Sequence, residues 1–400
     1  MLKKIRVSEL ALGMYIHEFC RPWVNDPFWI KHIEVELQDV EVLRLIQQST
    51  TTEVWIDTCR GKRPEDCDGV CLERLDEPQS CADIEPATLQ DELHRAQEIC
   101  DKAKTAVMCM FTDARMGRAM DMGDVDVLVV EISKSIMRHP HALISLSRLK
   151  NSDEYTYMHS VAVCALMVAL AKRMGMSEEM VREAGAAGLL HDVGKMMIPL
   201  DILNKPGRLT TDEFIAMKTH PEAGLKILQE NSYVSPSAMD VCLHHHEKYD
   251  GTGYPHGLVG EEIHLLSRMG AICDVYDAVT SERPYKKGWG AAQSIREMAT
   301  WKGHFDEKVF QNFVRTVGIY PIGALVRLES GRLAVVIEQN ETSLLLPKVK
   351  VFMSALTRKP LEHRVVNLAS QHERDPIVRI ESADDWGISD LDQIWCKKKD

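Results

Sequence analysis

The chain has 400 residues, which is long enough for two or three domains with a buried core. Its formal net charge of −12 excludes a broad basic surface for duplex nucleic acid. The sequence contains no apolar run long enough to span a bilayer. The 11 cysteines are scattered, which fits reduced thiols better than a disulfide framework, and we therefore expect a cytoplasmic protein.

Residues 1–60 are expected to form a small α+β domain. Within it, residues 39–48 carry apolar side chains at helical spacing, and residues 53–57 alternate between apolar and polar side chains as a strand does. Residues 61–86 are rich in Pro, Asp, Glu and Gly and show no periodicity, which indicates a linker.

Residues 87–322 are predicted to form a helical domain. Ser177, followed by two glutamates, is typical of the N-cap of a helix that runs to Leu190. Residues 211–213 open a later helix with a threonine and two acidic side chains.

Residues 323–400 are predicted to form a β-rich C-terminal extension. Residues 324–328 and 332–338 flank a Ser-Gly pair and predict a β-hairpin. Residues 344–346 and 349–351 are candidates for further strands. The expected fold class is therefore mainly α, with a small α+β domain before the helices and strands after them.

The stretch His191-Asp192-Val193-Gly194-Lys195 follows a run of small and apolar residues that is typical of a buried helix. Burying a histidine beside an aspartate is costly unless a partner satisfies both. A divalent metal does so, because imidazole and carboxylate are both metal ligands. Gly194 frees the backbone to leave the helix, and Lys195 then lies within reach of a phosphate that the metal holds.

Further metal-ligand candidates lie elsewhere in the helical region. Asp274 stands in an apolar run, where an unpaired carboxylate would be costly. Taken alone, each histidine also fits a simpler interpretation, as a packed core residue, a helix-end residue or part of a surface cluster. Seven nitrogen and oxygen ligands are too many for one metal, but they suit two metals that share Asp192. The candidates are His159, His191, Asp192, His220, His245, His246 and Asp274.

Together these residues resemble the motifs of the HD superfamily of metal-dependent phosphohydrolases. The segment His245-His246-Glu247-Lys248-Tyr249-Asp250-Gly251-Thr252-Gly253-Tyr254-Pro255 is similar to the signature of the HD-GYP branch, the cyclic di-GMP phosphodiesterases. Arg283-Pro284-Tyr285-Lys286 also matches that branch. The resemblance covers residues 149–318 closely, and residues 1–60 resemble the small domain of unknown function that precedes many HD-GYP domains.

The resemblance implies an all-helical HD-type bundle that binds two metal ions. One ion would be bound by His159, His191, Asp192 and Asp274, and the other by Asp192, His220, His245 and His246. Asp192 and Lys195 would be the catalytic residues, Lys195, Arg283 and Lys286 would bind substrate phosphate, and Gly253, Tyr254 and Pro255 would form a signature loop beside the site. Iron or manganese is the expected metal, although nickel and zinc accept the same ligands.

A third metal is the less favoured alternative. Family members that bind one carry a glutamate one helical turn before the first histidine. Tyr155 occupies that position here, and Glu154, one residue further back, points to another face of the helix. We therefore expect two metals.

The expected reaction is metal-dependent hydrolysis of cyclic di-GMP to the linear dinucleotide pGpG, which lowers the level of this second messenger; onward hydrolysis to GMP stays open. One rival is an HD phosphohydrolase that acts on another nucleotide. The other is a catalytically silent sensor or scaffold that binds cyclic di-GMP or a protein. Such modules usually lose ligands, whereas all seven ligand positions are filled here. Protein partners are expected at the Gly-Tyr-Pro loop or the N-terminal domain.

Overall fold

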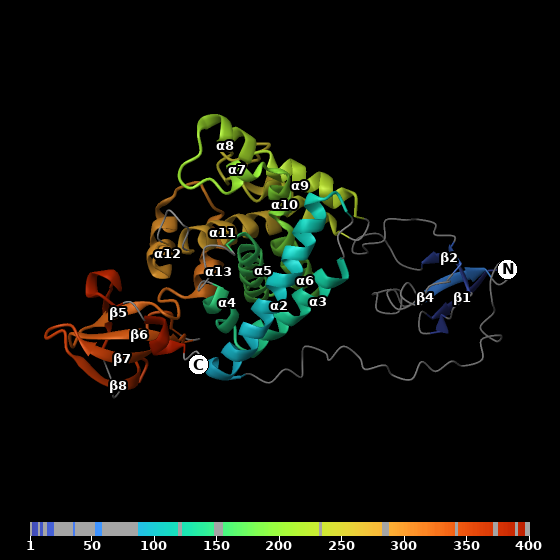
Figure 1. Cartoon of the computed structure of the whole chain (residues 1–400). Helices are drawn as coiled ribbons and strands as arrows, with labels where there is room; N and C mark the ends of the chain where they lie inside the picture. The colour runs from blue at the N-terminus through green and yellow to red at the C-terminus, as the bar shows by residue number, and fades with distance from the viewer. Residues whose placement is uncertain are drawn as a thin grey trace. The chain divides into compact units, whose positions relative to one another are not determined.

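A computed structural model describes most of the helical and C-terminal regions and short parts of the N-terminal region. The described residues are 2–6, 9–10, 14–19, 35–36, 53–57, 87–118, 122–147, 155–231, 234–281, 288–340, 343–370, 375–388 and 391–396. The chain divides into two compact units, Met1–Ser80 and Cys81–Asp400 (Figure 1). The mainly α fold expected from the sequence is confirmed, whereas the finer domain boundaries stay predictions.

The first unit contains a four-stranded antiparallel sheet with the strand order β1-β4-β2-β3. Its strands are β1 (Leu2–Arg6), β2 (Tyr15–Phe19), β3 (Val35–Glu36) and β4 (Glu53–Asp57). The strand predicted at residues 53–57 is thus β4, and its Ile56 is fully buried, as is Met14. The helix predicted at residues 39–48 lies outside the described residues.

Helices form the body of the second unit. They are α2 (Leu89–Arg115), α3 (Met122–Arg138), α4 (Ala142–Ser147), α5 (Tyr155–Arg173), α6 (Glu178–Leu190), η5 (Val193–Met197), α7 (Leu200–Leu203), α8 (Thr211–Met217), α9 (His220–Gln229), α10 (Pro236–His244), η6 (Gly260–Glu262), α11 (Leu265–Thr280), α12 (Ala291–Thr300) and α13 (Glu307–Val317). Figure 1 shows α5 in the middle of this body. No helix in the described part of the chain is both long and apolar enough to cross a membrane.

Capping side chains begin several helices where the sequence predicts them. The hydroxyl of Ser177, the N-cap of α6, accepts a hydrogen bond from the backbone N–H of Met180. α8 begins at Thr211, and the preceding Thr210 forms a reciprocal capping box with Glu213. These caps satisfy backbone N–H groups that have no partner within the helix.

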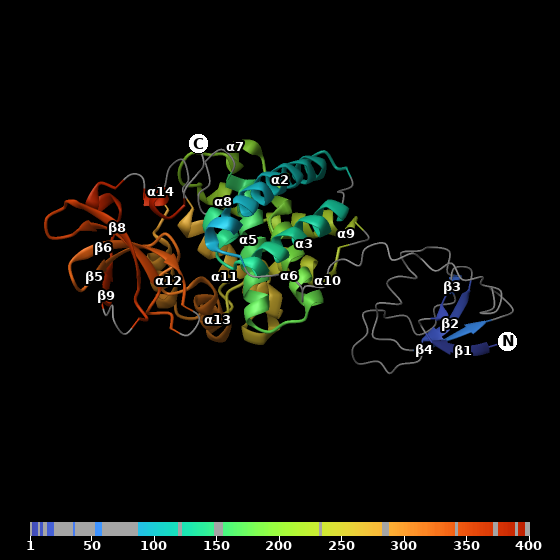
Figure 2. The same ribbon diagram turned by 90° about the horizontal axis from the view of Figure 1, so that it is seen from below.

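A five-stranded antiparallel sheet with the order β8-β7-β6-β5-β9 lies at one end of the helical body (Figure 2). Its strands are β5 (Leu325–Leu328), β6 (Arg332–Glu338), β7 (Lys348–Ser354), β8 (Pro360–Asn367) and β9 (Ile377–Ile380), and η7 (Asp384–Trp386) and α14 (Leu391–Trp395) follow. The predicted hairpin is confirmed as β5 and β6, and residues 349–351 lie in β7. The strand predicted at residues 344–346 is wrong, because the chain must reverse direction there between antiparallel neighbours.

Alternate residues of β6 face two different apolar cores, as the period of a strand requires. Leu333 and Val335 belong to the core that the sheet shares with the helices, whereas Ala334 packs in a smaller cluster within the sheet. The side-chain amide of Gln90 on α2 also donates to the backbone carbonyl oxygen of Trp395 on α14 at 2.8 Å. The C-terminal sheet is therefore packed against the helical body.

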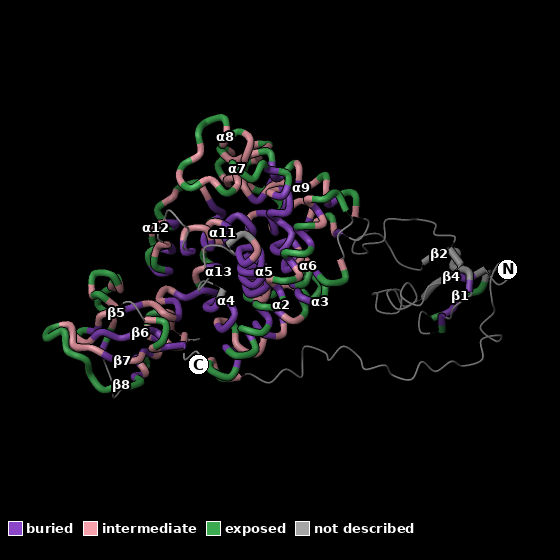
Figure 3. The backbone as a smooth tube through the Cα atoms, viewed as in Figure 1, coloured by how far each residue is buried: buried purple, intermediate pink, exposed green. Residues whose placement is uncertain are grey.

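The crossing of α5 and α6 brings two metal-ligand candidates together. α5 is buried along most of its length (Figure 3). At the crossing, a Cβ atom at Gly188 of α6 would lie 2.9 Å from the backbone of Cys164 on α5, so only glycine permits this approach. As a result, the rings of His159 on α5 and His191 after α6 have centroids 5.1 Å apart.

Candidate metal centre

Seven polar side chains from five segments converge inside the second unit. His159 lies on α5, His191 and Asp192 directly follow α6, His220 begins α9, His245 and His246 directly follow α10, and Asp274 lies on α11. All are buried except His246, whose side chain is 23% exposed. The structure brings together all seven side chains that the sequence singles out, and their role as ligands stays a prediction.

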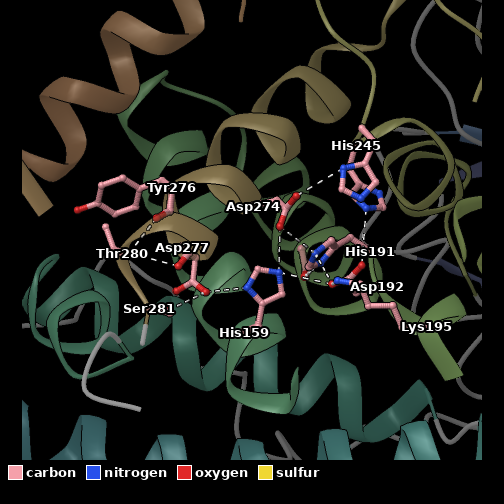
Figure 4. Close-up of polar contacts among 12 residues, drawn as sticks. His159, His191, Asp192, Lys195, His245, Asp274, Tyr276, Asp277, Thr280 and Ser281 are labelled. Carbon is pink, nitrogen blue, oxygen red and sulfur yellow. Dashed lines mark hydrogen bonds and ion pairs between the residues drawn. The ribbon is translucent and has the colours of Figure 1, made fainter. Parts of the chain in front are cut away.

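The carboxylate of Asp192 lies near two pairs of histidines, and Figure 4 labels His159, His191 and His245 among them. Its Oδ2 lies 3.5 Å from Nε2 of His159 and 3.3 Å from Nε2 of His191. Its Oδ1 lies 3.4 Å from Nε2 of His220 and 3.7 Å from Nε2 of His245. Each oxygen therefore faces one pair, which is the arrangement of a carboxylate that bridges two ions.

Asp274 also faces both groups of histidines. Its Oδ1 lies 3.0 Å from Nε2 of His159 and 4.0 Å from Nε2 of His191, and its Oδ2 lies 3.8 Å from Nδ1 of His246. Two adjacent ligand clusters result. Candidate ligand atoms lie within 4.8 Å of one another in the cluster of His159, His191 and Asp192 and in the cluster of His220, His245 and His246.

Hydrogen bonds at Nδ1 set the tautomer of three of these histidines. The pairs are Nδ1 of His191 with the carbonyl oxygen of Gly188 at 2.8 Å, that of His220 with Met217 at 2.7 Å, and that of His245 with Cys242 at 3.0 Å. A carbonyl oxygen only accepts, so each Nδ1 carries the hydrogen. Each Nε2 therefore presents a lone pair toward Asp192, as a metal ligand does.

Asp277, which is not among the residues predicted from the sequence, positions His159, the remaining histidine of the first pair. Its Oδ2 lies 2.6 Å from Nδ1 of His159 and accepts a hydrogen bond from the hydroxyl of Ser281 at 3.3 Å (Figure 4). A carboxylate in this place fixes the orientation of a metal-binding imidazole and raises its basicity. The spacing of three residues from Asp274, which puts both carboxylates on one side of α11, is the signal that could have revealed it.

Two buried polar atoms at the centre lack hydrogen-bond partners among the described residues. They are Nε2 of His191 and Oδ1 of Asp192. An imidazole lone pair and a carboxylate oxygen both accept, so they cannot satisfy each other, and leaving such a group unsatisfied costs about 1–3 kcal/mol. Divalent cations would satisfy both atoms, and the donor set therefore fits metal ions.

Burial keeps the second histidine cluster neutral. It lowers the pKa of His220 to about 4 and that of His246 to about 3, and it holds the pKa of His245 well below its usual value. Neutral imidazole is the form that binds a metal. His159 differs. Burial alone would lower its pKa, but its hydrogen bonds with Asp274 and Asp277 outweigh burial and raise that pKa.

Lys195 and Gly194 lie on η5, directly after Asp192. The ammonium group of Lys195 contacts Oδ2 of Asp192. Burial favours protonation of Asp192, but the charge of Lys195 outweighs it and holds the pKa of the carboxyl well below its usual range. Gly194 is required by close packing, because a Cβ atom there would overlap the backbone carbonyl oxygen of His220.

The predicted signature loop packs beside the centre. The ring of Tyr254 stacks on that of His246, with centroids 4.7 Å apart. Burial and the charge of Asp274 raise the pKa of the Tyr254 phenol, so it stays protonated at neutral pH. His244, the last residue of α10, does not belong to either cluster of candidate ligands. Its Nδ1 lies 2.9 Å from a carboxylate oxygen of Asp240.

Glu247, for which the sequence predicts no role of its own, holds the end of this loop. Its buried carboxylate accepts hydrogen bonds from the backbone N–H groups of His256 at 2.7 Å and Gly257 at 3.0 Å. Gly253 permits the loop to fold back, because a Cβ atom there would lie 2.5 Å from Cα of Glu247. The peptide bond that precedes Pro255 is cis.

Three predicted positions lack described side chains. Arg283 and Lys286, which are predicted to bind phosphate, lie outside the described residues. Tyr155 is the first residue of α5, one turn before His159, and its side chain also lies outside the described part. The roles of all three stay predictions.

Comparison with known proteins decides the family. The chain is 52% identical over 410 residues to a cyclic di-GMP phosphodiesterase of Pseudomonas aeruginosa, and the match covers 99% of this chain and 96% of that protein. The chain belongs to the HD-domain family of cyclic di-GMP phosphodiesterases. The family's HD domain matches residues 132–309, and a domain of unknown function (DUF3391) matches residues 2–125.

Other known proteins match a smaller part of the chain. A cyclic di-GMP phosphodiesterase response regulator of Xanthomonas campestris is 40% identical over 180 residues, which is 43% of this chain and 47% of that protein. A solved structure of an HDG"Y"P protein from Bdellovibrio bacteriovorus is 17% identical, with a TM-score of 0.47 over 78% of this chain and 98% of that one. The resemblance to HD-GYP proteins, and to the small domain that precedes their HD domain, is confirmed.

Proposed function

We propose that this chain is a metal-dependent phosphodiesterase that hydrolyses cyclic di-GMP to linear pGpG. The position of Asp192 carries the proposal, because its two carboxylate oxygens face two separate pairs of histidines. A pair of adjacent divalent ions suits such a site, and paired ions suit phosphodiester hydrolysis. The names of the family's members in Pseudomonas and Xanthomonas support the choice of substrate.

The donor atoms support two ions. We assign the first ion to His159, His191, Asp192 and Asp274, and the second to Asp192, His220, His245 and His246. When bound, divalent ions supply the Lewis acid chemistry that polarises a phosphoryl oxygen and acidifies water. We propose iron or manganese, and nickel and zinc accept the same donors. Tyr155, in place of a glutamate one turn before His159, favours two ions over three.

The protein's own side chains supply orientation and charge. The hydrogen bonds at Nδ1 hold the imidazole rings so that their Nε2 lone pairs face one carboxylate. Lys195 adds a positive charge directly beside Asp192. We assign Lys195, with Arg283 and Lys286, to the phosphate that is cleaved, because cations are most effective where negative charge grows during the reaction.

The cysteines of the centre do not supply a nucleophile. Cys242 follows Val241 on α10 and Cys273 precedes Asp274 on α11. Burial raises the pKa of both thiols, so both stay protonated at neutral pH. Attack by water therefore suits this centre better than attack by a thiolate.

We place the reaction in the cytoplasm. Three described cysteines of the helical body, Cys164, Cys242 and Cys273, are buried as free thiols, which fits a reducing compartment. Binding of protein partners through the Gly-Tyr-Pro loop or the N-terminal domain stays a proposal.

Product analysis tests the proposed function against its two rivals. The purified full chain is incubated with cyclic di-GMP or with nucleoside phosphates, and the products are separated by chromatography. We expect conversion of cyclic di-GMP to pGpG, which a chelator abolishes and added iron or manganese restores. Binding of cyclic di-GMP without turnover by metal-loaded protein would indicate a silent sensor. Faster turnover of another nucleotide would indicate a different phosphohydrolase.

A further inference from the structure

A row of side chains leads from the metal centre to the surface at α8. The row starts at His246, on which the ring of Tyr254 stacks. The ammonium nitrogen of Lys218 lies 5.0 Å from the centroid of the Tyr254 ring and 4.9 Å from that of Phe214. Phe214 is 47% exposed, and α8 projects from the helical body (Figure 1). The row thus connects a proposed metal ligand with an aromatic ring that is open to solvent.

The end of α8 fixes the backbone of Lys218 relative to the centre. Lys218 is the C-cap of α8, and its backbone N–H donates to the carbonyl oxygen of Phe214 at 3.0 Å. The residue before it, Met217, accepts the hydrogen bond from Nδ1 of His220 at 2.7 Å. The helix end that orients a metal ligand therefore also positions Lys218.

Lys218 carries a positive charge that forms no ion pair with any carboxylate in the described part of the chain. Two lysines of neighbouring segments are already paired, Lys205 with Glu213 at 2.6 Å and Lys195 with Asp192. Lys218 is half-buried near two aromatic rings. Aromatic rings attract a cation but leave its N–H donors available to an anion. This ammonium group is therefore suited to an anionic ligand.

We propose that Lys218 and Phe214 form a subsite for the half of the cyclic dinucleotide that is not being cleaved. Lys218 would bind the second phosphate, and Phe214 would stack on the adjoining base. This inference rests on the function proposed above. Because successive members of the row are 4.7 and 5.0 Å apart, the Lys218 ammonium lies no more than about 10 Å from the centroid of His246. The two phosphates belong to one small ring, so a cation this near the centre can reach the second phosphate.

The two side chains would contribute differently to recognition. An aromatic ring stacks on any base, so Phe214 would add affinity without selecting a sequence. Lys218 would favour substrates that carry a second phosphate, because the single phosphate of a simple diester would lie at the metal centre and leave no phosphate for Lys218 to bind. The subsite therefore predicts a change in substrate preference when the charge of Lys218 is removed.

The test compares two substrates with the full-length, metal-loaded protein. Cyclic di-GMP has two phosphates, whereas bis(p-nitrophenyl) phosphate has one and reports on the metal centre alone. Lys218→Gln removes the charge, Lys218→Arg keeps it, and Lys226→Gln removes an exposed lysine of α9 as the matched control. We expect Lys218→Gln to raise the KM for cyclic di-GMP about tenfold, which is typical of a lost charged hydrogen bond. Lys218→Arg and Lys226→Gln should keep the KM for cyclic di-GMP near that of the unaltered protein. All three variants should hydrolyse bis(p-nitrophenyl) phosphate at nearly the rate of the unaltered protein.

Two further measurements separate anion binding from a purely structural role. Added salt should narrow the KM difference between the unaltered protein and Lys218→Gln, because salt screens the attraction between the ammonium group and phosphate. Phe214→Ala should also raise the KM for cyclic di-GMP, whereas Ile215→Ala, at an exposed neighbour on α8, should not.

Several results would overturn the subsite. One is an unchanged KM for cyclic di-GMP in Lys218→Gln. Another is an equal loss on both substrates with reduced metal content, which would make Lys218 a structural support of the centre. If the unaltered protein fails to hydrolyse cyclic di-GMP, the proposed function fails separately. Equilibrium binding of cyclic di-GMP then decides, and the subsite stands only if Lys218→Gln weakens that binding.

Discussion

Replacing Asp277 by asparagine should weaken metal binding while the centre keeps its shape. Asp277 lies 2.6 Å from Nδ1 of His159 and accepts a second hydrogen bond from Ser281 at 3.3 Å. An asparagine of the same size can still present an oxygen to Nδ1. It lacks the negative charge, however, that makes Nε2 of His159 a stronger donor to a metal.

The kind of contact that is lost indicates the size of this effect. Loss of a partner of this kind typically weakens metal affinity 10- to 100-fold, which corresponds to about 1.4–2.8 kcal/mol. Asp277→Asn keeps the hydrogen bond and should fall at the lower end, near tenfold. Asp277→Ala leaves a buried N–H of His159 without this acceptor, so it should fall at the upper end and should also destabilise the fold by about 1–3 kcal/mol.

Competition with a chelator measures the metal affinity of each variant, and thermal unfolding of the metal-free protein measures stability. Asp240→Asn is the matched control, because Asp240 forms a similar pair with His244 at 2.9 Å, and His244 is not among the proposed ligands. Metal affinity that is unchanged in both Asp277 variants would refute the reasoning. An equal loss in Asp240→Asn would show that any carboxylate of this region that pairs with a histidine has the same effect.

Three further predictions concern the chain path, the substrate and the product. Gly194→Ala should lower the midpoint of thermal unfolding and reduce bound metal, because its Cβ atom would overlap the carbonyl oxygen of His220, and such overpacking costs about 3 kcal/mol or more. Gly290→Ala, whose Cβ atom would meet no atom within 4 Å, should have little effect. Equal unfolding midpoints for Gly194→Ala and Gly290→Ala in calorimetry would contradict this prediction. Arg283→Ala should raise the KM for cyclic di-GMP and leave the metal content intact, and Arg283→Lys should also raise that KM, because a point charge cannot replace a bidentate guanidinium. If Arg283→Ala loses metal but keeps its affinity for cyclic di-GMP, the assignment of Arg283 to the substrate phosphate is wrong. A product time course should show pGpG accumulating before GMP, because Tyr155 replaces the glutamate that a third metal requires, and the appearance of GMP from the start would argue against this interpretation.

The sequence predicts the helices and the ligands because both depend on local physical chemistry. Ser177 and the capping box of α8 are determined within a single turn of helix. The pair His191 and Asp192 follows a helix that must be buried, and a buried pair of this kind requires a partner. For the same reason Asp274 could be predicted from its apolar neighbours.

Contacts between distant segments could not be predicted in this way. Glu247 acts on backbone N–H groups that lie nine and ten residues later. Lys218, the C-cap of α8, lies over the ring of Tyr254 in the signature loop only because the chain folds back upon itself. Asp277 resembles any polar residue of a helix until α5 is packed against it.

The C-terminal sheet shows the same difference. β5 and β6 carry apolar residues that pack in a core, and their sequence predicts a hairpin. β8 exposes residues 360–365 in succession, so its side chains do not alternate between apolar and polar as a half-buried strand does. Its pairing with β7 supplies the backbone hydrogen bonds that the side-chain pattern does not reveal.

Metal analysis together with turnover of cyclic di-GMP in Asp192→Ala tests the central claim most directly. Asp212→Ala, at an exposed acidic residue in the first turn of α8, is the control. We predict two ions per chain and hydrolysis of cyclic di-GMP for the unaltered protein and the control. Asp192→Ala should lose most of its metal and all measurable turnover, with an unchanged helical circular dichroism spectrum. Near-normal metal content together with near-normal turnover in Asp192→Ala would contradict a centre bridged by this carboxylate.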